Sequence, residues 1–145
     1  MLVAIVRHGD AGFAAEDRLR TLTDYGRQQL ELTAEKLKPY GFEQILTSSY
    51  VRARESGDIL AQNLNLPISV LDGITPDDSA TDAVFSFPEQ GNLIIVSHMP
   101  LVSSLVSVLC EGTETGGPFF NTGSATILEM DLPGPGLARL KAFSG

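Results

Sequence analysis

The residues best suited to chemistry are two histidines and two arginines, each placed at or just after the end of a short apolar segment. His8 and His98 are the only histidines in the 145-residue chain. Arg7 stands beside His8, and Arg52 follows a third apolar segment by a few residues. A neutral imidazole can attack phosphorus and form a covalent intermediate, and guanidinium groups offer forked donors that match phosphate oxygens. These residue types therefore predict an anion site with a nucleophile.

Physical arguments for a phosphate site have to be weighed against a purely structural role for these residues. The arginines should disfavour the imidazolium form of His8 and keep it available as the free base. Gly9 has no side chain, which lets backbone and phosphate approach closely. Arg52 falls in the first turn of an expected helix, where the macrodipole disfavours a cation unless an anion lies beside it. Alone, Arg52 could be an exposed arginine and His98 a local cap, but their common placement with His8 favours a phosphate site.

The elements that must position these residues alternate between strand and helix. We expect strands at residues 2–6, 44–47, 68–71, 93–96, 125–130 and 137–142. We expect helices at residues 22–38, from 48 or 49 to about 64, 79–87 and 100–109. This alternation predicts an α/β three-layer sandwich with a mostly parallel central sheet flanked by helices, to which the C-terminal pair adds antiparallel pairing. Ligands of such sheets bind beyond the carboxyl ends of the strands, which is where the histidines fall.

Local signals indicate where these helices begin and end. Thr23 or Asp24 can cap the first helix, which Pro39 and Gly41 should end. Ser48 or Ser49 can cap the second. Pro100 suits the first turn of the last helix.

Composition narrows the class of protein. The chain has 10 lysines and arginines against 18 aspartates and glutamates, a formal charge of −8, which argues against nucleic acid and anionic membranes as partners. The apolar run of residues 1–6 is too short for a signal peptide or a membrane span. The single cysteine, Cys110, cannot form an intramolecular disulfide. We therefore expect a cytoplasmic protein with one domain over residues 1–145.

A metal site is a weaker interpretation of the same residues. Two histidines and one cysteine lack any tight ligand spacing such as H-x-H or C-x-x-C. We accordingly expect neither a metal nor a cofactor.

Several short motifs resemble those of the histidine phosphatase superfamily. Arg7-His8-Gly9 after an N-terminal strand resembles its R-H-G signature, and residues 22–26 resemble its L-T-x-x-G helix start. Residues 48–53 are similar to its S-x-x-x-R-A element, and Ser97-His98 to its late S-H element. Their order and spacing match throughout. Within the superfamily, residues 7–11, 64–67 and 97–102 most resemble SixA-type phosphohistidine phosphatases.

The resemblance implies a phosphoglycerate mutase-like fold and a metal-free phosphatase. His8 would be phosphorylated and then hydrolysed, and Arg7, Arg52 and His98 would complete the phosphate pocket. Arg20 matches a further arginine of SixA-type proteins and would also face the phosphate. The implied substrate is a phosphohistidine-bearing protein, such as a phosphotransfer domain of a two-component relay.

Larger members of the superfamily carry an acidic proton donor. The sequence does not single out one residue of this chain as its counterpart. Spacing alone allows five carboxylates for that role, although a solvated surface position is the favoured interpretation of each: Asp10, Glu16, Asp17, Asp77 and Asp78. A phosphoramidate can leave as neutral imidazole once its ring nitrogen is protonated, whereas an alkoxide needs more help from a general acid. This difference predicts a preference for P–N over P–O bonds.

Two other functions stay open on the sequence. A small-molecule phosphatase of the same superfamily would use His8 on a sugar phosphate, and a clear acid donor with specificity insertions would favour it. A phosphate-binding module that has lost turnover would hold phosphate without releasing it, which the intact set of Arg7, His8, Arg52 and His98 argues against.

Overall fold

The computed structural model describes residues 1–144 and arranges six strands in one sheet, in the order β3-β2-β4-β1-β5-β6. The strands are β1 Leu2–Arg7, β2 Gln44–Thr47, β3 Ile68–Val70, β4 Leu93–Ser97, β5 Ala125–Glu129 and β6 Arg139–Ser144. The helices are α1 Asp24–Leu37, α2 Val51–Leu64, α3 Ala80–Ser86 and α4 Leu101–Glu111, with short 3₁₀ turns η1 Asp17–Leu19 and η2 Lys38–Tyr40.

The sheet has a parallel part and an antiparallel part. Strands β3, β2, β4 and β1 pair in parallel. β5 pairs antiparallel to β1, and β6 pairs antiparallel to β5. The predicted mostly parallel sheet, with antiparallel pairing at the C-terminal end, is therefore confirmed.

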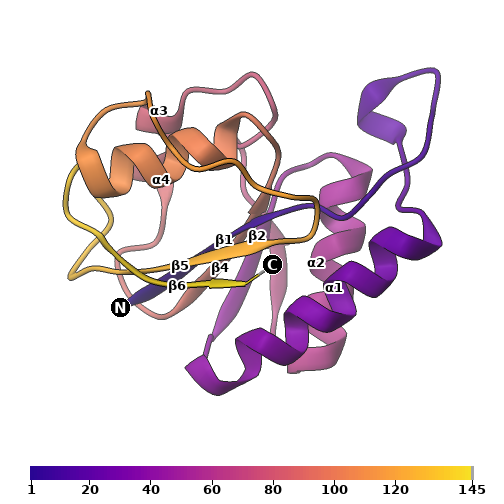
Figure 1. The fold of residues 1–145 in the computed structure, drawn as a ribbon, viewed down its shortest axis with the longest axis horizontal. Coiled ribbons are helices and arrows are strands. Elements are labelled where there is room, and N and C mark those ends of the chain that lie inside the picture. Colours follow the sequence, from indigo (N-terminus) through magenta and orange to yellow (C-terminus); the bar gives the residue numbers. More distant parts are fainter. Residues whose placement is uncertain (145) are drawn as a thin grey trace.

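Helices cover both faces of the sheet (Figure 1), with α1 and α2 on one face and α3 and α4 on the other. Successive side chains of a strand point to opposite faces. In β1, Val3 and Ile5 pack in the core under α3 and α4, whereas Ala4 and Val6 pack in the core under α1 and α2. The two cores and the sheet between them form the predicted three-layer sandwich.

Helix α1 begins and ends on the expected signals. The Thr23 Oγ1 atom accepts a hydrogen bond from the Gly26 N–H at 3.0 Å, which satisfies one of the free donors of the first turn. The face that carries Leu30, Ala34 and Leu37 is buried. The chain then turns through η2 to Gly41, whose φ of 69° is favourable for glycine.

Three differences from the sequence prediction have an identifiable local cause, and the other boundaries agree within two residues. Tyr50, rather than Ser48 or Ser49, is the N-cap residue of α2, and the Ser48 Oγ accepts from the Tyr50 N–H at 3.1 Å just outside the helix. Pro100 is the N-cap residue of α4 rather than part of its first turn. The last strand is shifted to Arg139–Ser144 because the Ala138 N–H donates to Leu109 at 2.8 Å, so the chain joins β5 only afterwards.

In the described part of the chain, no helix combines the length and apolar character needed to cross a membrane. Within residues 1–144 no three histidine, cysteine or carboxylate side chains are grouped so as to hold a metal ion.

Candidate active site

Three neighbouring strands end together at one edge of the sheet. β4 lies between β1 and β2 in the sheet, and Arg7 is in register with Ser97. Backbone hydrogen bonds continue one residue past the strands, from the His8 N–H to Ser97 at 3.0 Å and from the Ser48 N–H to Val96 at 3.0 Å. The side chains of His8, Ser48 and His98 are thereby held at one edge without an intervening flexible loop.

His8 is buried, with 6% of its surface exposed, and its two ring nitrogens have different partners. Nδ1 lies 2.7 Å from the Gly9 carbonyl, which can only accept, so Nδ1 carries the ring proton. Nε2 accepts a hydrogen bond from Arg52 Nε at 3.2 Å. Burial lowers the pKa of His8 to about 4, with smaller contributions from Arg52, Arg7 and Arg20 and an opposing one from the Gly9 hydrogen bond. His8 is thus a free base at neutral pH, as predicted, although burial rather than the arginines is the main cause.

His98 is buried beside His8, and the two ring centroids are 5.1 Å apart. Its Nε2 is hydrogen-bonded to the Ser48 hydroxyl at 2.7 Å, and the Tyr50 ring meets it edge-on at 5.0 Å. Burial, and then the charges of His8 and Arg52, lower the pKa of His98 to about 3. Both imidazoles are therefore neutral at physiological pH.

Arg52 joins the nucleophile candidate to the segment that precedes α1. Its guanidinium is 5% exposed and uses all three nitrogens. Nε donates to His8, whereas Nη1 and Nη2 donate to the backbone oxygen and the carboxylate of Asp17 at 2.7 and 3.2 Å. The Tyr50 ring centroid lies 5.1 Å from its central carbon, within the range of a cation–π contact. Because Arg52 lies in the first turn of α2, its charge and the helix N-terminus both favour an anion next to His8.

Arg7 is fixed by the loop that precedes β5. Its Nη1 donates to the Phe120 carbonyl at 2.8 Å, and its central carbon lies 5.9 Å from the ring centroid of Phe119. Its Nε is buried and finds no hydrogen-bond partner within residues 1–144. Burial, and then the charge of Arg52, lower the pKa of Arg7.

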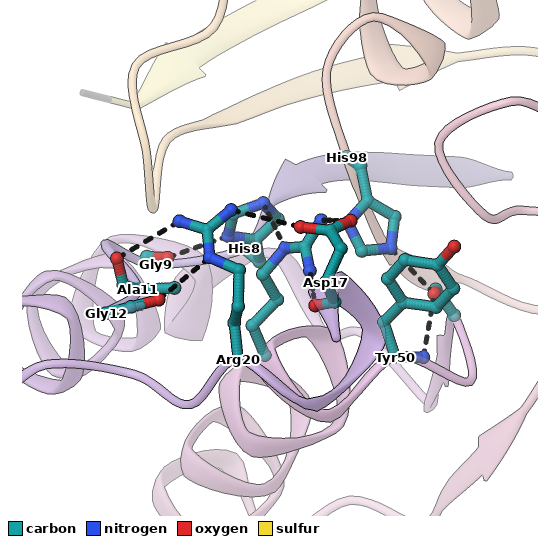
Figure 2. Close-up of polar contacts among 10 residues, drawn as sticks. His8, Gly9, Ala11, Gly12, Asp17, Arg20, Tyr50 and His98 are labelled. Atoms are coloured by element: carbon teal, nitrogen blue, oxygen red, sulfur yellow. Dashed lines mark hydrogen bonds and ion pairs between the residues drawn. The ribbon is translucent and has the colours of Figure 1, made fainter. Parts of the chain in front are cut away.

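Arg20 reaches the same region through its partners. Its Nε and Nη2 donate to the carbonyls of Gly12 and Ala11 at 2.8 and 3.2 Å, and Nη1 donates to the Asp17 carboxylate at 3.3 Å (Figure 2). Its charge contributes to the lowered pKa of His8. The structure therefore brings together all the predicted side chains: His8, His98, Arg7, Arg52 and Arg20.

Gly9 is held between the site and α1. Its N–H donates to the buried Ser56 hydroxyl at 3.0 Å. A Cβ atom at Gly9 would lie 2.6 Å from both the Gly26 carbonyl oxygen and a methyl carbon of Leu30. Helix α1 therefore approaches Gly9 too closely to leave room for a side chain, and a Cβ atom at Gly26 would likewise collide with the backbone oxygen of Asp10.

Of the five carboxylates considered as proton donors, Asp17 is the one that contacts the predicted site residues. Asp10 accepts from the Thr23 hydroxyl at 2.7 Å, and Glu16 pairs with Arg18 on the surface. Asp78 accepts from Thr75, and Asp77 is exposed. Burial would raise the pKa of Asp17, but hydrogen bonds and charges from Arg20 and Arg52 lower it overall.

Sequence reasoning did not assign Ser48 and Tyr50 to the site. Ser48 orients the His98 ring, and Tyr50 contacts both His98 and Arg52. The signal for Ser48 lies in its position, since it follows β2 directly, as His8 follows β1. No local signal marks Tyr50, because its role depends on how α2 packs against β4.

The fold and the site together define an α/β protein in which arginine side chains surround a buried, neutral histidine. The sequence profile of the histidine phosphatase superfamily (branch 1) matches residues 3–75. This chain belongs to the histidine phosphatase superfamily, and it is a phosphatase of that class.

Comparison with individual relatives shows which members of the superfamily this chain is similar to. The chain is 37% identical to phosphohistidine phosphatase SixA of Escherichia coli (strain K12), over 94% of this chain and 89% of the relative. It is 34% identical to the SixA homolog of Haemophilus influenzae, over 75% of this chain and 77% of the relative. It also superposes on a solved structure of the protein histidine phosphatase SixA complexed with tungstate, with a TM-score of 0.87 and 30% identity, over 100% of this chain and 97% of that one.

Proposed function

We propose that this protein is a phosphohistidine phosphatase that removes the phosphoryl group from a phosphohistidine side chain of another protein. The observation that carries the proposal is the neutral His8 with its Nε2 lone pair directed at Arg52. The likeness to SixA, named as a phosphohistidine phosphatase, supports the substrate class. We further propose that the partner is a protein such as a phosphotransfer domain and that the reaction takes place in the cytoplasm.

The reaction consists of two phosphoryl transfers. His8 Nε2 attacks phosphorus, the P–N bond of the substrate breaks, and the leaving imidazole takes up a proton. Water then attacks phospho-His8, the second P–N bond breaks, and inorganic phosphate leaves while the water loses a proton. Because phosphoryl transfer spreads charge over the equatorial oxygens, positioning and electrostatic stabilisation provide most of the catalysis.

The proposed roles of the other residues follow from their donors. Arg7 and Arg52 neutralise the phosphoryl oxygens, and Arg20 adds a third positive charge. The Ser48 hydroxyl donates to Nε2 of His98, so that the proton of the neutral ring resides on Nδ1 and donates to a phosphoryl oxygen. The Gly9 carbonyl holds the proton of His8 on Nδ1 and keeps Nε2 unprotonated, so that its lone pair can attack once the hydrogen bond from Arg52 is given up.

The substrate preference gives the proposal its sharpest test. The purified protein would be assayed for phosphate release from a phosphohistidine-bearing protein, from p-nitrophenyl phosphate and from sugar phosphates, each with wild type and His8→Ala. We expect fast release from phosphohistidine, slower release from the esters, and a loss of at least about 10⁴-fold in His8→Ala, as for removal of a nucleophile.

The two outcomes against the proposal are distinct. Comparable or faster cleavage of sugar phosphates would retain His8 as nucleophile and make the protein a small-molecule phosphatase. Phosphorylation of His8 without release, or no turnover of any substrate, would instead make it a phosphate-binding module.

A further inference from the structure

The carboxylate of Asp17 joins the two arginines that flank the nucleophile candidate. Oδ2 accepts from Arg52 Nη2 at 3.2 Å, and Oδ1 accepts from Arg20 Nη1 at 3.3 Å. In Figure 2 this carboxylate lies between the side chains of Arg20 and His98. Its negative charge also acts on His98, whose pKa it raises against the effect of burial. An anion therefore already stands among the positive groups of the pocket.

The Asp17 carboxylate occupies a donor of Arg52 that a phosphoryl oxygen could also use. Nε and Nη2 are adjacent donors on one edge of the guanidinium, the edge that binds oxyanions in a forked manner. Here Nε points to the lone pair of His8 Nε2, and Nη2 points to Asp17 Oδ2. A phosphoryl group bonded to His8 Nε2 would require the same edge, so the Asp17 carboxylate and the phosphoryl oxygens compete for Nη2.

The two partners differ in their freedom to move. The Arg52 side chain is 5% exposed, whereas the Asp17 side chain is 58% exposed. The carboxylate can turn into solvent and be hydrated, but the guanidinium cannot. A buried guanidinium without a counter-charge is costly, so Asp17 compensates Arg52 when no other anion is present.

We propose that the Asp17 carboxylate is an internal ligand of the phosphate subsite, which an incoming phosphoryl group displaces and which returns to help expel inorganic phosphate. Asp17 thereby sets the affinity of the pocket for oxyanions and limits inhibition by product. The inference rests on the proposed phosphatase function, because it concerns the same subsite.

Binding of inorganic phosphate tests this role without any turnover. Isothermal titration calorimetry at pH 7 and constant ionic strength would compare wild type with Asp17→Asn, in which the amide oxygen can still accept from Arg52 but carries no charge. Loss of a charged competitor should tighten phosphate binding about ten-fold. Because the charge that compensates the buried Arg52 is lost, the thermal midpoint of phosphate-free Asp17→Asn should fall below that of wild type and should recover when phosphate is added.

Glu16→Gln is the matched control, since it removes the same charge from the neighbouring position. Glu16 is 59% exposed and pairs with Arg18 rather than with the site. We expect it to change phosphate affinity by less than about two-fold, because charges on the surface are screened.

Two results would overturn the proposal. Equal affinities in Asp17→Asn and Glu16→Gln would mean that only net charge matters. Weaker binding in Asp17→Asn would mean that the carboxylate holds Arg20 and Arg52 in place for phosphate and does not compete with it. Neither result depends on phosphohistidine being the substrate, so failure here is separable from failure of the proposed function.

Discussion

The carboxyl-end edge of the sheet and the layer formed by α3 and α4 are both buried, yet burial has different consequences in the two regions. At the edge, His8, Arg52 and His98 are at most 6% exposed, and each is hydrogen-bonded to a specific partner. In the α3/α4 layer, buried residues such as Leu105 and Leu109 are apolar. Exclusion of water lowers the pKa values of the histidines at the edge. In the α3/α4 layer it contributes to the free energy of folding.

The comparison implies a division between activity and stability. A polar group in the edge region is kept because its charge or lone pair is needed, although its desolvation costs free energy. An apolar side chain in the α3/α4 layer stabilises the fold through the area it removes from water. Substitutions at the carboxyl-end edge should therefore lower activity and leave stability almost unchanged. Substitutions in the α3/α4 layer should lower stability and leave activity almost unchanged.

Arg52→Lys should produce the largest effect and act on activity. Lysine keeps the positive charge but loses the planar fork that contacts His8 and Asp17 together. We expect kcat/KM to fall by about 10³-fold, in the range for removal of one transition-state donor, with a thermal midpoint near that of wild type. Arg54→Lys is the matched control, because Arg54 is exposed on the same helix and should behave as wild type. A large loss of stability in Arg52→Lys would break the proposed division.

Leu105→Ala should produce an intermediate effect and act on stability. Leu105 is fully buried in the α3/α4 core, so its truncation leaves a cavity and should lower the free energy of unfolding by about 2–5 kcal/mol. Urea titration followed by circular dichroism measures this change. Leu32→Ala, on the exposed side of α1, should cost less than about 0.5 kcal/mol. Below the unfolding transition, Leu105→Ala should retain a near-normal kcat, and a severe loss of kcat would contradict the separation of the two regions.

The smallest expected effect is a flat titration of both histidines between pH 8 and pH 5.5. Their pKa values of about 4 and 3 lie below the ordinary value of 6.5, so neither ring should gain a proton in that range. The unfolded chain does bind those protons, so stability is greatest above pH 6.5 and decreases as the pH falls towards 4. Because the chain has two histidines, ring carbon resonances in NMR report on each. A midpoint near 6.5 for His8 would show that burial does not control the edge region.

Much of the fold and the site follows from sequence pattern. Short apolar strands alternating with amphipathic helices predict the three-layer sandwich, and β1 and β4 occur almost where their apolar runs indicate. Since parallel strands end at a common edge, the positions of His8 and His98 directly after two such runs predict that they lie close together. The helix caps at Thr23 and Ser79 are likewise local in origin.

The remaining features depend on contacts between distant parts of the chain. Asp17 follows no strand and lies in a short 3₁₀ turn, and its importance arises only when α2 brings Arg52 to it. β6 begins later than its apolar pattern indicates because the Ala138 N–H donates to the Leu109 carbonyl of α4, a contact between distant segments of the chain. Glycine is needed at position 9 because α1 packs closely against it. No sequence motif indicates that contact.

The hydrogen bonds that continue one residue past β1 and β2 bear on how this protein can evolve. His8 and Ser48 are tied to β4 by backbone groups whose geometry does not depend on side-chain identity. The connections at residues 75–79 and 112–117 can therefore change length and composition without moving the reacting nitrogen, whereas Phe120 and Gly123 are hydrogen-bonded to Arg7 and His8 and are constrained. New substrates can be accommodated by altering those connections, provided that the three strands keep their register and α2 keeps Arg52 beside His8.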